Sequence, residues 1–263
     1  MTAFVVALHA EAKPLIEHYQ LTLTDNKNKI YTNETIALII SGMGPTNAII
    51  ATTLLGAMYH PKIFINIGIA GAANNEYSLE DVYLINKIYD IQNNRYYFPD
   101  ILYDLNLHES DITTSPTPIE ESSLIQTNLV DMECSGFFIA ASRFVTNERI
   151  FAIKVVSDFL VNTILDKEYI SKLISLTIKT VDKILSLNIS TNTILHEDIQ
   201  IRLQTIIENL KLTKTQQSQL IDFTKYSVLN SKELDFLTQL ENSASTTKDE
   251  RNKLLRSILN VAH

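Results

Sequence analysis

The chain has 263 residues, 45% hydrophobic and 20% charged, a composition typical of a folded globular protein. Its formal net charge of −8 and pI of about 5.3 make nucleic acid and anionic membranes poor partners, because both are negatively charged. Cys134 is the single cysteine, which excludes an internal disulfide and is typical of a reducing compartment. The N-terminus lacks the charged start of a signal peptide, and its apolar run is too short to span a membrane. We therefore expect a cytoplasmic protein.

The first part of the chain predicts strands that alternate with helices. Strands are expected at 3–8, 35–42, 62–71, 81–90 and 149–158, and helices at 45–60, 132–145 and 167–187. All six glycines and all six prolines fall at or before Gly136, and such breakers are typical of strand-and-turn architecture. This alternation predicts an α/β domain over residues 1–189, with a mostly parallel sheet covered by helices.

From Ser190 the pattern changes to short amphipathic segments, at 197–212, 214–229, 231–241 and 246–262. Each repeats apolar residues at helical spacing. Thr247 and Glu250 have the spacing of a capping box before the last segment. We expect an all-α extension over residues 190–263, serving as a docking or self-association module or simply forming a small helical core.

Candidate functional residues stand where the predicted strands end, because ligands of open α/β sheets bind beyond the carboxyl ends of the strands. Glu11 follows the first strand, "GIAG" closes the third and Ser157 with Asp158 closes the last. Glu133 begins a helix, and the glycine turn "SGMGPTN" precedes another. Each also has a structural explanation: a solvated Glu11, an N-cap at Asp158, a helix-dipole partner at Glu133.

Taken in order, these motifs resemble the purine nucleoside phosphorylase/uridine phosphorylase superfamily, and within it the methylthioadenosine/S-adenosylhomocysteine nucleosidase branch. The resemblance runs from residue 3 to about 187 and is carried by "ALHAEAKPL", "SGMGPTNAIIAT", "INIGIAGAANNEYSLEDVYL", "VDMECSGFFIA" and "IKVVSD". It implies a three-layer α/β sandwich with a central mixed sheet, and no metal or organic cofactor. It also implies a homo-oligomer, at least a dimer, because family enzymes often complete the pocket with a neighbouring subunit.

The resemblance also implies a role for individual residues in cleaving an N-ribosyl bond. Asp158, positioned with Ser157, would protonate the departing base. Glu133 would hold the ribose hydroxyls, and Glu11 would activate the attacking water. The remaining expected substrate-binding residues are Met132, which would pack on the sugar, Gly44, Ala70, Gly71 and Lys154. We interpret Asp131 as a helix cap only.

Departures from the family pattern bear on the reaction. Ile69 stands where the nucleosidases usually have Ser or Thr, and Lys154 stands where Arg is usual. Both changes weaken phosphate binding and favour hydrolysis over phosphorolysis. The short stretch from Asp81 to Asp131 lacks the usual Phe-containing base-binding segment. Residues 96–98 could stack on a base, although a packed hairpin is the favoured interpretation.

Three hypotheses follow for the function. The first is a nucleosidase that hydrolyses a purine nucleoside or thionucleoside. The second is a phosphorylase of the same fold, supported by the glycine turn and Lys154. The third is a non-catalytic nucleoside-binding or interaction protein, supported by Ile69 and the helical extension. Phosphate dependence of base release separates the first two, and binding without turnover identifies the third.

Overall fold

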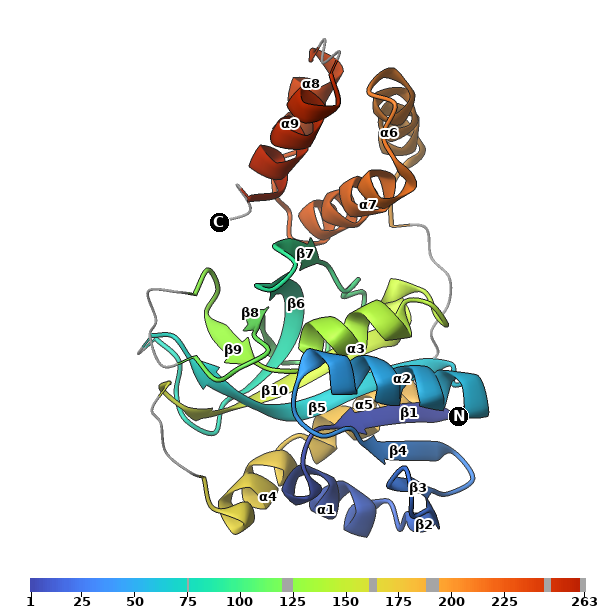
Figure 1. Cartoon of the computed structure of the whole chain (residues 1–263), viewed down its shortest axis with the longest axis vertical. Helices are drawn as coiled ribbons and strands as arrows, with labels where there is room; N and C mark the ends of the chain where they lie inside the picture. Colours follow the sequence, from blue (N-terminus) through green and yellow to red (C-terminus); the bar gives the residue numbers. More distant parts are fainter. Residues whose placement is uncertain (75, 120–124, 161–164, 188–193, 244–246, 261–263) are drawn as a thin grey trace.

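The computed structural model describes residues 1–74, 76–119, 125–160, 165–187, 194–243 and 247–260. An α/β domain carries the first five helices, and a group of four further helices stands at one end of it, beside β7 (Figure 1). The strands are β1 (Thr2–Val6), β2 (Thr22–Asp25), β3 (Ile30–Thr32), β4 (Ile36–Ile40), β5 (Ile63–Ala72), β6 (Val82–Asp90), β7 (Arg95–Tyr97), β8 (His108–Thr114), β9 (Leu129–Asp131) and β10 (Ile150–Asp158). The helices of the α/β domain are α1 (His9–His18), α2 (Pro45–Tyr59), α3 (Cys134–Ala141), α4 (Lys167–Ser175) and α5 (Ile178–Ser186).

The described strands form one mixed sheet in the order β10-β6-β8-β9-β5-β1-β4-β3-β2, with β7 beside β6. β1 runs parallel to β4 and to β5, whereas β10 runs antiparallel to β6. β10 also pairs with β5 in parallel, so part of the sheet closes on itself. The carboxyl ends of β1, β5 and β10 therefore meet at one edge.

The sheet has a hydrophobic core on each face. Along β1, Ala3 and Val5 join a buried cluster that includes side chains of α2 and α3. The alternate residues Phe4 and Val6 join a second cluster with α1, α4 and α5. This alternation is the two-residue period of a strand buried on both faces. The predicted three-layer α/β sandwich is confirmed (Figure 1).

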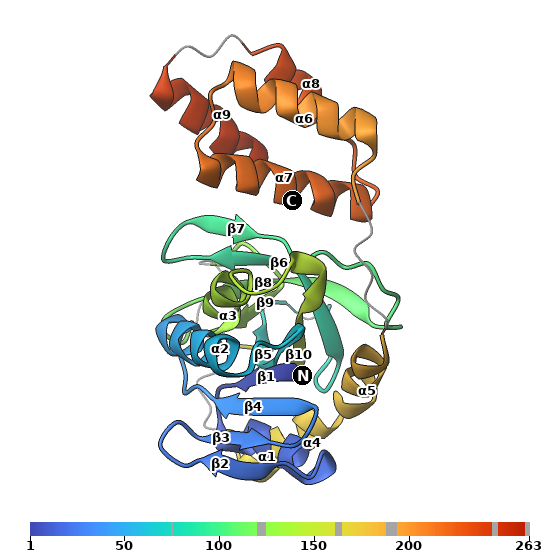
Figure 2. The same cartoon turned by 90° about the vertical axis from the view of Figure 1, so that its right-hand side faces the viewer.

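The extension consists of α6 (Glu197–Asn209), α7 (Lys214–Leu229), α8 (Asp235–Glu241) and α9 (Lys248–Asn260). These helices share a core that also contains Tyr96 and Phe98 of the α/β domain. The Phe98 ring lies 4.9 Å from the ring of Tyr226 on α7, measured between centroids. Figure 2 shows α7 lying along β7. The predicted all-α extension is thus confirmed, and so is the packed hairpin at residues 96–98.

Two features of the helices were predicted incompletely. The helix expected at 167–187 is two helices, because the chain turns at Leu176 and Thr177 with near-helical backbone angles that leave the apolar period almost unbroken. α1 was not predicted as a helix, because Pro14 lies inside it and removes a backbone donor. The carbonyl oxygen of Ala10, four residues earlier, instead accepts a hydrogen bond from the Ser171 hydroxyl at 2.7 Å.

The capping box expected at the start of the last helix is present. The Thr247 hydroxyl oxygen accepts from the backbone N–H of Glu250 at 3.2 Å, and the Glu250 carboxylate accepts from the backbone N–H of Thr247 at 3.2 Å. The predicted domain boundary between residues 189 and 190 lies outside the described residues.

Candidate active site

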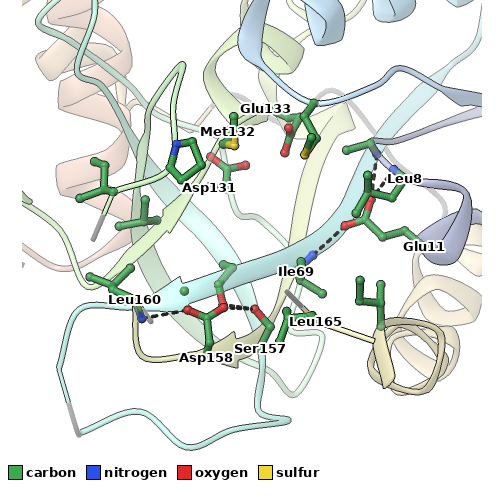
Figure 3. Close-up of a pocket in the computed structure, with 18 of the residues that line it drawn as sticks. Leu8, Glu11, Ile69, Asp131, Met132, Glu133, Ser157, Asp158, Leu160 and Leu165 are labelled. Atoms are coloured by element: carbon green, nitrogen blue, oxygen red, sulfur yellow. Dashed lines mark hydrogen bonds between the residues drawn. The ribbon is translucent and has the colours of Figure 1, made fainter. Parts of the chain in front are cut away.

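A pocket of about 510 Å³ opens beyond the carboxyl ends of β1, β5 and β10. Glu11, Glu133 and Asp158 reach it from three different elements and point toward its centre (Figure 3). Asp131 also lines it, beside Met132. Its volume lies within the ~300–1,000 Å³ common for small-molecule sites. The edge of the sheet predicted to bind a ligand therefore contains a pocket of suitable size.

Glu11 is fixed in one orientation by the backbone around it. Its Oε2 accepts hydrogen bonds from the N–H groups of Ala7 and Leu8, both at 2.9 Å, and its Oε1 accepts from Ile69 N–H at 3.1 Å. Burial raises the pKa of this carboxyl, while the charge of Lys154 and the three N–H groups act in the opposite direction. Glu11 is 2% exposed, so the alternative of a solvated residue is wrong. The result is a rigid carboxyl with increased basicity.

Ser157 and Asp158 end β10 at an irregularity in its pairing with β5. The register shifts between Val156 and Asp158, which is how a β-bulge redirects a side chain next to a site. The Ser157 hydroxyl donates to Asp158 Oδ2 at 2.7 Å, and the N–H of Leu160 donates to Asp158 Oδ1 at 2.8 Å. Asp158 therefore points into the pocket with both oxygens oriented (Figure 3).

Glu133 is positioned by the contact between α2 and α3. A Cβ added at Gly136 would overlap the backbone of Pro45, so glycine lets the two helices approach closely. Gly44, at φ +102°, turns its N–H toward Glu133 and donates to Oε1 at 2.9 Å. Burial, followed by the nearby charge of Asp131, raises the pKa of Glu133 to about 7. Glu133 thus titrates near neutrality.

Asp131, in the pocket lining, forms a buried ion pair with Lys154, which lies behind the pocket. Lys154 Nζ lies 2.7 Å from Asp131 Oδ2, and both side chains are 1% exposed. The same oxygen accepts from Cys134 N–H at 2.9 Å, so the predicted cap exists. The interpretation of Asp131 as a cap only was wrong, because its main partner is a cation. Burial alone lowers the pKa of Lys154, but Asp131 and its neighbours more than reverse this effect, and the lysine stays charged.

The predicted site residues divide into two groups. The residues that line the pocket are Glu11, Ala70, Gly71, Met132, Glu133, Ser157 and Asp158. Gly44 and Lys154 lie behind it, bonded to Glu133 and Asp131 respectively, and their contact with substrate stays a prediction. The sequence reasoning missed Asp131 and an apolar wall made by Leu8, Val130, Leu160, Leu165 and Ile170. A carboxylate two residues before Glu133 at a strand end was the available signal for Asp131.

The charged side chains among the described lining residues are all acidic. These described residues include four carboxylates, Glu11, Asp131, Glu133 and Asp158, but no Lys, Arg, His or aromatic side chain. Such a pocket favours developing positive charge and disfavours a bound anion. No set of three or more His, Cys, Asp or Glu residues suited to a metal occurs among the described residues. None of the described helices combines the length and hydropathy needed to cross a bilayer.

The fold is of the nucleoside phosphorylase type. Residues 2–122 match the family model described as the phosphorylase superfamily, which confirms the resemblance found in the sequence. A 5'-methylthioadenosine/S-adenosylhomocysteine nucleosidase from Staphylococcus haemolyticus is 37% identical over 62 residues, which are 24% of this chain and 27% of that protein. The match to this curated relative thus spans about a quarter of its length.

Solved structures share the fold at low identity. The apo 5'-methylthioadenosine nucleosidase of Arabidopsis thaliana superimposes with a TM-score of 0.60 at 18% identity, covering 70% of this chain and 93% of that chain. The futalosine hydrolase of Helicobacter pylori superimposes with a TM-score of 0.59 at 13% identity, covering 70% of this chain and 96% of that chain. At this identity the likeness shows the fold alone.

Proposed function

We propose that the protein is a nucleosidase that hydrolyses the N-ribosyl bond of a purine nucleoside or thionucleoside. The observation that carries the proposal is the convergence of Glu11, Glu133 and Asp158 on one pocket of about 510 Å³. Breaking an N-ribosyl bond builds positive charge on the sugar and negative charge on the base, as in other glycoside cleavages. Three carboxyls in different surroundings can stabilise the positive charge on the sugar and supply a proton to the base.

Asp158 is the proposed acid for the departing base. Its two oxygens are oriented by Ser157 and by the N–H of Leu160, so a proton on the carboxyl is held in a fixed direction. Proton transfer to a ring nitrogen of the base makes the base a better leaving group. The pocket lies in front of this carboxyl, where a purine would fit.

Glu133 and Glu11 are the proposed groups on the sugar side. Glu133, with one oxygen bonded to Gly44, offers the other to ribose hydroxyls. Glu11 accepts a proton from the attacking water, and its raised pKa makes it a better base than a solvated carboxylate. The surrounding carboxylates stabilise the positive charge that develops on the ribose.

Hydrolysis is favoured over phosphorolysis by the charges around the pocket. No cation occurs among the lining residues that the structure describes, and Lys154 is paired with Asp131. Ile69 exposes an aliphatic side chain where a hydroxyl would be needed to hold phosphate. The carboxylates would repel a phosphate ion, because no positive charge in the described lining compensates them, whereas they would not repel a neutral water molecule.

The test is release of free base from adenosine, inosine, methylthioadenosine and S-adenosylhomocysteine, followed by chromatography with and without phosphate. We expect release that does not depend on phosphate. Ribose 1-phosphate formed only with phosphate would identify a phosphorylase instead. Nucleoside binding without release from any substrate would favour the non-catalytic hypothesis.

The titration of Glu133 predicts the pH dependence of catalysis. Ribose binding needs the ionised carboxylate, and its pKa is about 7. We expect kcat/KM to rise about tenfold per pH unit below pH 7, because this ratio reports the free enzyme. Glu133→Gln should lower kcat/KM and remove this limb, and a limb that persists in the variant would assign it to another group.

The same titration predicts a stability effect of defined sign. The folded-state pKa of Glu133, about 7, is above its usual value of 4.5, so ionisation costs more in the folded protein than in the unfolded chain. Wild type should therefore lose on the order of a few kcal/mol of unfolding free energy between pH 4.5 and 7, relative to Glu133→Gln. Urea unfolding at both pH values measures it.

We propose that the protein acts as a cytoplasmic homodimer, with α2 at the interface. The buried, unpaired thiol of Cys134 is compatible with a reducing compartment. Met43, Ile50 and Met58 lie on or beside α2 and are 58%, 62% and 49% exposed. Met43 also lines the pocket, so a partner on this face would lie next to bound substrate. An apolar face of this kind is typical of a protein interface.

Ile50→Glu is expected to shift the protein to monomers in sedimentation velocity, because the charge would be buried against a second copy. Ile201→Glu is the matched control, since Ile201 on α6 is 61% exposed and lies outside the proposed interface. Dissociation caused by Ile201→Glu alone would place the interface on the extension.

A further inference from the structure

A second cavity of about 420 Å³ lies where the extension meets the α/β domain, separate from the proposed active site. Its apolar wall comes from the extension and consists of Ile194, Leu195, Leu203, Ile207 and Ile221. Its polar lining consists of Asp100 and Glu148 of the α/β domain, Gln200 and Gln204 of α6, and Lys225 of α7. The cavity therefore joins aliphatic side chains to a charged end, as small-molecule sites do.

Asp100 is the unusual group in this cavity. Its side chain is fully buried, and its Oδ2 accepts a hydrogen bond from Lys225 Nζ at 3.0 Å. Its Oδ1 is also buried and has no hydrogen-bond partner among the described residues. Buried carboxylate oxygens are normally satisfied, because an unpaired one loses its hydration without compensation. A ligand that donates a hydrogen bond would correct this.

The charges around Asp100 favour a positively charged donor. The described lining has two carboxylates, Asp100 and Glu148, against one cation, Lys225. Asp222, behind Lys225 on α7, adds a third carboxyl, whose Oδ1 accepts from the side-chain amide of Asn147 at 3.3 Å. Burial, partly offset by Lys225, and the charge of Asp100 hold the pKa of Asp222 at about 7. Arg149 Nε lies 3.8 Å from Glu148, so the negative charge in excess around Asp100 is that of Asp222 and amounts to at most one unit.

We propose that this cavity binds a small organic cation with a primary ammonium or guanidinium head and an aliphatic body. The head donates a hydrogen bond to Asp100 Oδ1, and the body packs on Leu203, Ile207 and Ile221. An anion would face uncompensated carboxylates, and a neutral alcohol would leave the excess charge in place. Because the walls come from both parts of the chain, the bound cation would also hold the extension on the α/β domain.

The test measures binding of n-butylamine and butylguanidine to the full chain by titration calorimetry and by the shift in Tm. n-Butanol and butyrate are the neutral and anionic controls of matched length. We expect both cations to bind with Kd of about 1 mM, which is reasonable for so few heavy atoms, and to raise Tm, while the controls do neither. Absence of cation binding at ten times that concentration, or equal binding of n-butanol, would overturn the proposal.

Variants locate the binding. Asp100→Asn should weaken cation binding at least tenfold, and Asp104→Asn, an exposed aspartate in the same loop, should leave it unchanged. Lys225→Met should act in the opposite direction, because it leaves Asp100 Oδ2 without its hydrogen-bond donor. The cations should bind this variant more tightly than they bind wild type, and they should raise its Tm by more. Ile207→Trp, which fills the cavity, should abolish binding even if Asp100→Asn fails to fold. Cation binding that survives Ile207→Trp would place the site elsewhere.

Discussion

Asp158→Asn is expected to reduce base release about 10²–10⁴-fold, because the amide keeps the shape of the carboxyl but cannot supply a proton to the leaving base. The effect should appear in kcat, since the proton is transferred only as the bond breaks. Folding should be largely unaffected, because the amide oxygen can still accept from Leu160 N–H. The amide NH2 would face the Ser157 hydroxyl, which can accept from it while donating to the carbonyl oxygen of Ala70. Single-turnover base release at saturating substrate measures the effect.

Ser157→Ala provides the graded comparison. It removes the hydroxyl that donates to Asp158 at 2.7 Å but leaves the acid in place. We expect a smaller loss than for Asp158→Asn, because Leu160 N–H still orients one oxygen. If Asp158→Asn retained full activity, Asp158 would not be the acid, and the proposal would have to assign the proton to another group in the pocket.

The sequence predicted the parts of the fold and site that depend on short-range pattern. Fully buried strands such as β5 and β10 appear as apolar runs, and their ends are marked by Gly71 and Asp158. Because these strands are parallel and adjacent, the residues that follow them meet at one edge. Glu11 was predicted for the same reason, although the helix that carries it was not.

Contacts between distant segments could not be predicted in this way. Asp131 ends β9 and Lys154 lies within β10, with α3 between them, and nothing near either residue in the sequence indicates an ion pair. The contact of Asp100 with Lys225 joins residues 125 positions apart. Short strands such as β7 and β9 have only three residues each, too few for a period to show. Tertiary pairing, rather than local propensity, decides these elements.

Lys154→Met is expected to cost about 3–5 kcal/mol of unfolding free energy, since it leaves Asp131 as a buried charge without its partner. The Thr114 hydroxyl and the backbone N–H of Cys134 still donate hydrogen bonds to the Asp131 carboxylate, but neither group supplies a positive charge. Asp131→Leu combined with Lys154→Met should recover much of the loss, because an apolar pair of similar volume avoids the desolvation of both ions. Chemical denaturation of the two single variants and the double variant gives the coupling energy.

Lys154→Met should also change the pH dependence of catalysis, in a direction that a loss of packing alone would not produce. The charge of Lys154 lowers the pKa of both Glu11 and Glu133 in the native site. Its removal should therefore move the acid limb of kcat/KM to higher pH, while Lys154→Arg should keep the limb near pH 7 because the charge remains. If Lys154→Met unfolds too readily to assay, Lys154→Arg still tests the charge. A limb shifted equally by Arg and Met would show that the position of the side chain, rather than its charge, controls Glu133.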